Sequence, residues 1–204
     1  MITGYDSIGG RGESRYEEKK SVFLGFALPV TTEEEAISFV SQIKKQYPDA
    51  RHHVYAYVLR EDNKSRYTDD GEPSGTAGMP VLDILRKQNL VDCVIVVVRY
   101  FGGTLLGTGG LVRAYTIAAK EAVVDAGVVT WRPLTDIELR VTYADYQKLT
   151  TQLSSVSVLD TRFENDVCLQ ISMPSEDTEG FINEFVNRTS GRGNAAILRE
   201  RFGF

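Results

Sequence analysis

Two loops hold the residues of this 204-residue chain whose types and spacing could support chemistry. The first is VVVRYFGGTLLGTGGLVRAY over residues 96–115. It begins at the end of a β-branched run, continues into a loop with five glycines in nine residues, and then enters a helical pattern. Glycine lets backbone amides approach a ligand closely, and a helix N-terminus adds partial positive charge. The expected anion- or nucleic-acid-binding residues are Arg99, Tyr100, Gly102, Gly103, Gly107, Gly109, Gly110, Arg113 and Lys120.

This glycine loop (residues 101–110) matches neither common phosphate fingerprint. The spacing Gly102-x4-Gly107 is followed by Thr108 instead of the lysine of a P-loop, and Val112 stands where a dinucleotide fingerprint has its last glycine. The alternative interpretation is a tight strand-to-helix crossover whose glycines serve packing. Both interpretations stay open.

The second loop, DDGEPS over residues 69–74, places three carboxylates within four residues. Asp69, Asp70 and Glu72 could hold a hard cation such as magnesium, or Asp70 could act as a base. Alternatively, the segment is an Asx-turn before a helix that Ser74 caps, with a carboxylate paired to Arg99 or Arg113. Ser74 lacks a histidine partner for a nucleophilic triad, and we expect neither a metal nor a cofactor.

Composition limits the classes of partner and compartment. The net charge of −5 does not support a broad electrostatic hold on nucleic acid, so such binding would need a local patch. Cys93 and Cys168 lie in strand-like runs and are expected to be buried, reduced thiols. His52 and His53 alternate faces of a strand, one inward and one exposed. Because neither a signal peptide nor a long apolar window is present, a cytoplasmic location is expected.

Periodicity and turn residues predict the elements of the first 131 residues. Residues 1–15 are polar and are expected to be extended or mobile, with the first strand near residue 20. Helix 32–47 is expected to be capped by Thr31 or Thr32. The predicted elements are strand 21–30, helix 32–47, strand 52–60, its hairpin partner 65–68, helix 76–88, strand 91–100 and helix 111–125.

A boundary is expected at residues 131–133, which gives two domains, 1–131 and 132–204. The second domain reads as strand 135–142, helix 144–155, strand 158–163, strand 167–173, helix 178–188 and strand 195–202. This βαββαβ order is the signature of a ferredoxin-like fold. The fold class is therefore α+β.

The segments TDDGEPSGTAGMPVL and VVVRYFGGTLLGTGGLVRAY, with HHVYAY and KKSVF, closely resemble the IMPACT family, in particular its bacterial YigZ-type two-domain members. The resemblance covers about residues 16–130. It implies a ribosomal-protein-like α/β sandwich similar to elongation factor G domain IV, followed by a domain similar to its domain V. Eukaryotic relatives restrain the kinase arm of the amino-acid-starvation response through protein partners, a role that is not carried over directly.

Together, these features predict a non-enzymatic cytoplasmic binding protein, linked to translation or stress, that contacts RNA, the ribosome or a protein partner. The competing hypothesis is an enzyme for a small phosphorylated or nucleotide-like substrate. In that case Asp69, Asp70 and Glu72 would act opposite the glycine loop. The sequence makes no prediction of the oligomeric state.

Overall fold

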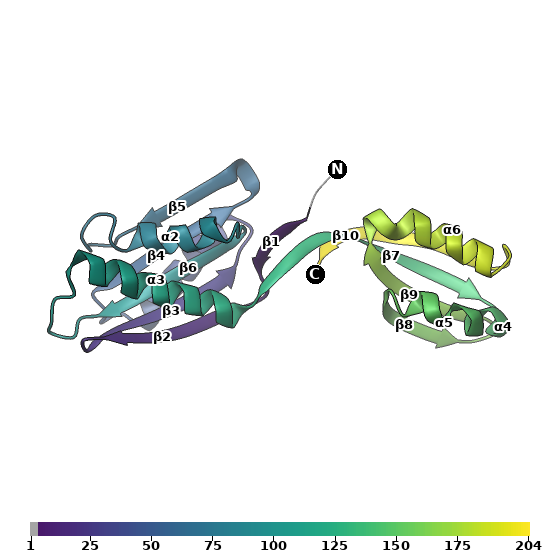
Figure 1. The fold of residues 1–204 in the computed structure, drawn as a ribbon, viewed down its shortest axis with the longest axis horizontal. Coiled ribbons are helices and arrows are strands. Elements are labelled where there is room, and N and C mark those ends of the chain that lie inside the picture. Colours follow the sequence, from purple (N-terminus) through teal and green to yellow (C-terminus); the bar gives the residue numbers. More distant parts are fainter. Residues whose placement is uncertain (1–3) are drawn as a thin grey trace. The chain divides into compact units, whose positions relative to one another are not determined.

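A computed structural model describes residues 4–204 of the chain (Figure 1). Residues 1–3, which belong to the segment predicted to be extended or mobile, lie outside the described residues. One compact unit comprises Tyr5–Thr130, and Trp131–Phe204 form the body of the other. Each unit is built on an antiparallel sheet with helices, which confirms the predicted α+β class.

The sheet of the first unit has the strand order β2-β3-β6-β4-β5. Its central strand β6 carries five consecutive β-branched residues, 94–98, that are buried on both faces, as the apolar run predicted. The helices α2 and α3 cover one face (Figure 1), and the α1 residues pack in a separate core on the other. The bounds are β2 Gly12–Glu18, β3 Ser21–Pro29, α1 Glu33–Gln46, β4 His52–Leu59, η1 Glu61–Asn63, β5 Lys64–Thr68, α2 Gly78–Lys87, β6 Cys93–Tyr100 and α3 Gly107–Ala126.

The start of α1 follows its sequence signal closely. Thr32 is the N-cap, and its side chain accepts a hydrogen bond from the backbone N–H of Glu35. The Glu35 carboxylate in turn accepts a hydrogen bond from the backbone N–H of Thr32, which completes a capping box. The predicted capping of this helix is confirmed.

The expectation that strands begin near residue 20 is wrong, because the strands β1 (Tyr5–Ile8) and β2 precede it. β2 pairs with β3 along its whole length through a two-residue turn at Lys19 and Lys20, both with positive φ. The side chain of Ser14 also donates to the carbonyl of Ala118 on α3 at 2.7 Å. Residues 12–18 are therefore ordered by pairing with β3 and by contact with α3, although their composition is polar.

The second unit has the strand order β10-β7-β9-β8, which is the predicted ferredoxin-like arrangement. Two details differ from expectation. The helix expected over 144–155 is divided into three short turns, and the strand expected over 135–142 begins earlier, at Val128. β7 therefore runs through the expected domain boundary at 131–133, where the chain divides into its two units between Thr130 and Trp131. The bounds are β7 Val128–Val141, α4 Tyr143–Tyr146, η2 Gln147–Leu149, α5 Thr150–Leu153, β8 Ser157–Phe163, β9 Val167–Pro174, η3 Ser175–Asp177, α6 Thr178–Arg188 and β10 Asn194–Gly203.

Both cysteines are buried and reduced, as expected. Burial raises the pKa of the Cys93 thiol to about 12. Among residues 4–204, no helix is both long enough and apolar enough to cross a membrane.

Candidate functional site

A buried ion pair joins the two signature loops. Glu72 of the acidic loop accepts a hydrogen bond from Nη1 of Arg99, at the end of β6, over 2.5 Å. The same oxygen, Oε1, accepts from the hydroxyl of Tyr115 on α3 over 2.8 Å. Arg99 is only 5 % exposed and Tyr115 is fully buried. One carboxylate thus connects the acidic loop, the central strand and the helix that follows the glycine loop.

The surroundings of this pair are largely aromatic. The guanidinium carbon of Arg99 lies 5.5 Å from the ring centre of Phe23, whose ring packs edge-on against Tyr115 at 5.1 Å. Burial, reinforced by the Glu72 carboxylate, raises the pKa of the Tyr115 hydroxyl well above its usual range. Tyr115 therefore serves as a neutral hydrogen-bond donor, and Arg99 is not available to an external anion.

Asp69 caps the helix that follows the acidic loop. Its carboxylate accepts from the backbone N–H groups of Gly75, Ala77 and Gly78 at 2.8, 3.1 and 2.8 Å. The expectation that Ser74 caps this helix is wrong, because α2 begins at Gly78 and has no cap from its preceding residue. A carboxylate nine residues upstream satisfies the free amides instead.

Asp70 fastens the loop to β4. It adopts a positive φ of 43°, and its carboxylate accepts from the backbone N–H of His53 at 2.7 Å. Nδ1 of His52 lies 2.9 Å from the carbonyl of Asp70, so this nitrogen carries the proton. Nε2 of His52 then lies 3.8 Å from Oε1 of Glu72. Both histidines are therefore held at the acidic loop. One of them was expected to face inward and the other to be exposed; in the structure His53 is buried and His52 is half-buried.

The three carboxylates of the acidic loop consequently point to three different partners. Asp69 binds helix amides, Asp70 binds strand β4, and Glu72 binds Arg99 and Tyr115. Within residues 4–204, no group of three or more His, Cys, Asp or Glu side chains is placed to hold a metal ion. The arrangement found is the structural alternative of the sequence analysis, with a carboxylate paired to Arg99.

The glycine loop differs from expectation at its helical end. α3 begins at Gly107, four residues before the predicted start, so Gly107, Gly109 and Gly110 are part of its first turn. The residue before it, Leu106, provides no side-chain cap, and Gly107 and Gly109 are exposed. The first amides of α3 are therefore presented to solvent without a capping side chain. The exposed loop also carries Leu105, whose side chain is 83 % exposed.

Gly102 and Gly103 serve the path of the loop. A Cβ at Gly102 would lie 2.1 Å from the carbonyl carbon of Lys20, and its N–H donates to the Ser21 hydroxyl at 3.1 Å. Gly103 has a φ of 84°, which favours glycine. The loop is thus pressed against the turn that carries the exposed residues Lys19 and Lys20.

The remaining predicted residues divide between the loop and other contacts. Arg113 is exposed on α3 and lies close enough to Tyr16 of β2 to influence its hydroxyl, whose pKa is raised mainly by the hydrogen bond to Glu18. Lys120 is exposed further along α3. The hydroxyl of Tyr100 donates to Asp49 at 2.9 Å, so it is directed to the connection after α1.

Comparison with known proteins identifies the family of this chain. Residues 19–123 match the family described as Impact N-terminal domain, and residues 139–192 match a domain of unknown function, DUF1949. The IMPACT family member YvyE of Bacillus subtilis is 34 % identical over 95 % of this chain and 91 % of its own length. The chain belongs to the IMPACT family.

Further matches support a two-domain, YigZ-type IMPACT protein. The IMPACT family member YigZ of Escherichia coli is 33 % identical over 90 % of this chain and 93 % of its own length. A solved structure, described as the crystal structure of an hypothetical protein, shares 28 % identity and a TM-score of 0.62. It covers 98 % of this chain and 99 % of its own.

The Impact N-terminal match includes both loops and also Lys19 and Lys20, which begin the family segment KKSVF but were not predicted as site residues. Two adjacent lysines are not a usual hairpin turn, so the local sequence did not predict the turn or its contact with Gly102. The role of Tyr115 was equally hidden, because its distance from Glu72 in sequence is 43 residues. Only the fold brings these groups together.

Proposed function

We propose that this IMPACT-family protein is a regulator in translation or stress that acts by binding, and that it contacts RNA. The contact lies on what we name the loop surface: the turn Lys19–Lys20, the glycine loop (residues 101–110) and Arg113. The family resemblance supports the regulatory part of this proposal. The exposed groups of the loop surface support the RNA part.

The observation that carries the proposal is the difference between buried and exposed groups at the two loops. Glu72, Arg99 and Tyr115 are buried and bound to one another, so they stiffen the loops without facing a ligand. The uncapped first turn of α3, the two lysines and Arg113 face solvent. Backbone amides at a helix start and basic side chains are the groups that bind phosphate oxygens.

The charge of the loop surface is local. Lys19, Lys20 and Arg113 supply three positive charges in a protein of net charge −5, and Glu18, which accepts a bond from Tyr16, offsets part of it. Such a small basic group favours a limited set of phosphate contacts over a broad hold on the nucleic acid. A short or structured RNA, including ribosomal RNA, fits this surface better than a long duplex.

The enzymatic alternative draws less support from the geometry. It requires Asp69, Asp70 and Glu72 to act at one place, whereas each carboxylate is directed to a different structural partner.

Affinity capture from native lysate, with and without ribonuclease, tests the proposed function. We expect RNA or ribosomal subunits to copurify with the full chain, to be lost on ribonuclease treatment, and to be reduced for the variant K19A/K20A/R113A. A matched control, K45A/R86A/K87A, removes the same charge from other exposed positions and is expected to behave like the wild type. A protein partner that resists ribonuclease and binds both variants would overturn the RNA proposal.

A further inference from the structure

The outer strand of the second unit has an exposed, partly apolar edge. β8 is the last strand in the order β10-β7-β9-β8, and its described partner is β9 alone. Three of its apolar side chains are exposed: Val158 at 46 %, Leu159 at 49 % and Phe163 at 60 %. A free strand edge offers a row of unpaired N–H and C=O groups to another strand. Such an edge is usually protected or used.

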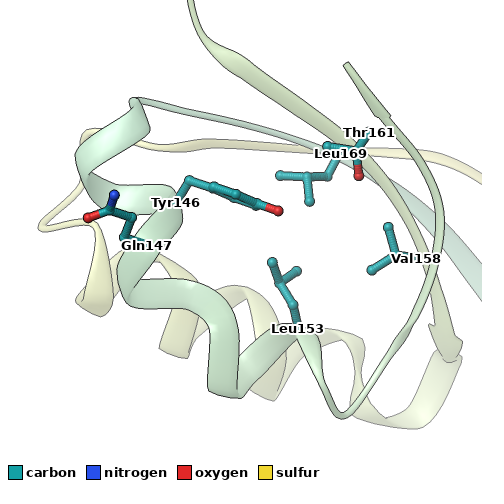
Figure 2. A pocket seen from close by; sticks show the side chains of 6 residues that line it. All are labelled: Tyr146, Gln147, Leu153, Val158, Thr161 and Leu169. Atoms are coloured by element: carbon teal, nitrogen blue, oxygen red, sulfur yellow. The ribbon is translucent and has the colours of Figure 1, made fainter. Parts of the chain in front are cut away.

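A cavity extends this apolar surface inward. It has a volume of about 310 Å³ and lies between β8 and the helical segment that precedes it (Figure 2). Val158 and Thr161 line it from the strand, and Tyr146 and Leu153 line it from the helical side. Because the cavity adjoins the middle of β8, a strand added at the edge would pass beside its opening.

The far end of β8 is already held in place. The ring of Phe163 lies 6.3 Å from the ring of Tyr143, stacked, and 5.9 Å from that of Tyr146, edge-on. The hydroxyl of Tyr143 donates to the carbonyl of Glu164 at 2.8 Å. The exposed phenyl group is therefore positioned before any partner arrives, which lowers the entropy cost of binding.

The charges on β8 identify the partner. Asp160 and Arg162 are about half-exposed, lie on either side of Thr161, and pair with each other within one copy at 3.4 Å, so pairing between two copies would exchange this contact for the same contact across the axis. We propose that β8 pairs antiparallel with β8 of a second copy of this chain, about a two-fold axis through Thr161. In this pairing Asp160 of each copy faces Arg162 of the other, and Leu159 of each copy faces Phe163 of the other. Two ion pairs and two apolar pairs form at once.

The register through Thr161 is the one that these charges select. An axis through Asp160 would place two aspartates opposite each other, and an axis through Arg162 would do the same with two arginines. Axes between residues place Asp160 opposite Thr161 or Phe163, without an ionic partner. A strand that is complementary to itself in one register alone favours an isologous dimer.

The length of the pairing is limited by a β-bulge. The register with β9 shifts between Val158 and Asp160 and skips Leu159, so the regular part of β8 runs from Asp160 to Phe163. An edge contact of this length with a few side chains buries little area, and small interfaces form weak dimers. The dimer is therefore expected at high protein concentration, or where another contact brings two copies together.

Sedimentation velocity on the full chain over increasing concentration tests the pairing. The wild type is expected to dimerise reversibly, and either D160R or R162D is expected to raise the dissociation constant at least about tenfold, because each breaks both ion pairs and adds repulsion. The double variant D160R/R162D restores both pairs and is expected to dimerise again. Thermal melts check that each variant folds, because Arg162 also pairs with Glu138 and with Asp160 within one copy.

A disulfide probe tests the register directly. Cysteines introduced by T161C would face each other across the axis at a Cα separation of roughly 4.5–5.5 Å, which a disulfide can bridge. Oxidation is expected to crosslink T161C far faster than I197C, a 54 % exposed position on β10 at the other edge. The proposal is overturned if the wild type stays monomeric throughout, if charge reversal leaves dimerisation unchanged, or if T161C crosslinks no faster than I197C or only to another protein.

Discussion

Oε1 of Glu72 lies 2.5 Å from Nη1 of Arg99, and both side chains are buried. This contact joins the acidic loop to the end of the central strand, and Tyr115 extends it to α3. The two motifs that identify the family are thus parts of one structural unit. We propose that the exposed amides and basic residues beside them are the groups that bind a ligand.

Removing the charge of Glu72 should be costly. Glu72→Gln leaves the Arg99 guanidinium buried without its carboxylate, and breaking such a pair typically costs about 3–5 kcal/mol of unfolding free energy. Urea denaturation at neutral pH measures this loss. The control Glu17→Gln removes a half-exposed partner of Arg15 and should cost at most about 1 kcal/mol. Equal losses in the two variants would contradict the structural role of the buried pair.

Asp69 and Ser74 should differ in their effect on α2. Asp69→Ala removes the acceptor of three backbone N–H groups and should lower the unfolding free energy by about 1–2 kcal/mol. Ser74→Ala should change it by no more than about 0.5 kcal/mol. Thermal or urea unfolding of the two variants checks the order. A larger loss for Ser74→Ala would show that the cap was assigned to the wrong residue.

Glu33 should give the first unit an acid-sensitive contribution to stability. The Lys64 ammonium group, followed by the Tyr57 hydroxyl, lowers the pKa of Glu33 from 4.5 to about 2. A folded-state pKa below the unfolded value means that the contribution is present above pH 4.5 and is lost as the pH falls through 2. The stability difference between wild type and Glu33→Gln should therefore shrink over this window.

Urea unfolding at several pH values between 7 and 2 measures this difference. Glu34→Gln, in the same helical turn, is the matched control and should show a difference that varies less with pH. A gap between wild type and Glu33→Gln that stays constant down to pH 2 would rule out the assigned contacts.

The glycines of the loop should respond in opposite ways. Gly102→Ala places a Cβ against the backbone of Lys20 and Ser21, and overpacking of this kind typically costs about 1–3 kcal/mol. A Cβ at Gly109 meets open space within a helix, so Gly109→Ala should stabilise the protein by up to about 1 kcal/mol. Thermal unfolding separates these outcomes. A destabilising Gly109→Ala would contradict the early start of α3.

Much of the fold could be predicted from sequence. β6 is a continuous apolar run, β3 and β4 read as strands between turn residues, and α1 has an apolar face and a clear N-cap. β2 could not, because its outer residues are charged and its turn is formed by Lys19 and Lys20 instead of glycine or asparagine. The start of α3 was missed because the glycines at 107, 109 and 110 indicate a loop by their low helix propensity, whereas α3 begins at Gly107, which has a positive φ of 72°.

The candidate site was predictable as two motifs but not as a geometry. The sequence left open whether the acidic loop pairs with an arginine or holds a metal, because side-chain direction depends on the register of β4 and β6. His52 lies opposite Arg99 in that register, which brings the acidic loop over the strand end. Arg99 is therefore a buried partner of Glu72, and the exposed basic residues beside the glycine loop include Lys19 and Lys20, which the β2–β3 turn brings there.

The salt dependence of RNA binding by the loop surface tests the central proposal most directly. A labelled single-stranded RNA is titrated with wild type, K19A/K20A/R113A and the control K45A/R86A/K87A at several salt concentrations. The proposal predicts weaker binding by the loop-surface variant and a logarithmic salt slope lower by about one for each lost phosphate contact. It also predicts that the control matches the wild type. Equal affinity and slope for all three proteins, or no binding by the wild type at low salt, would contradict it.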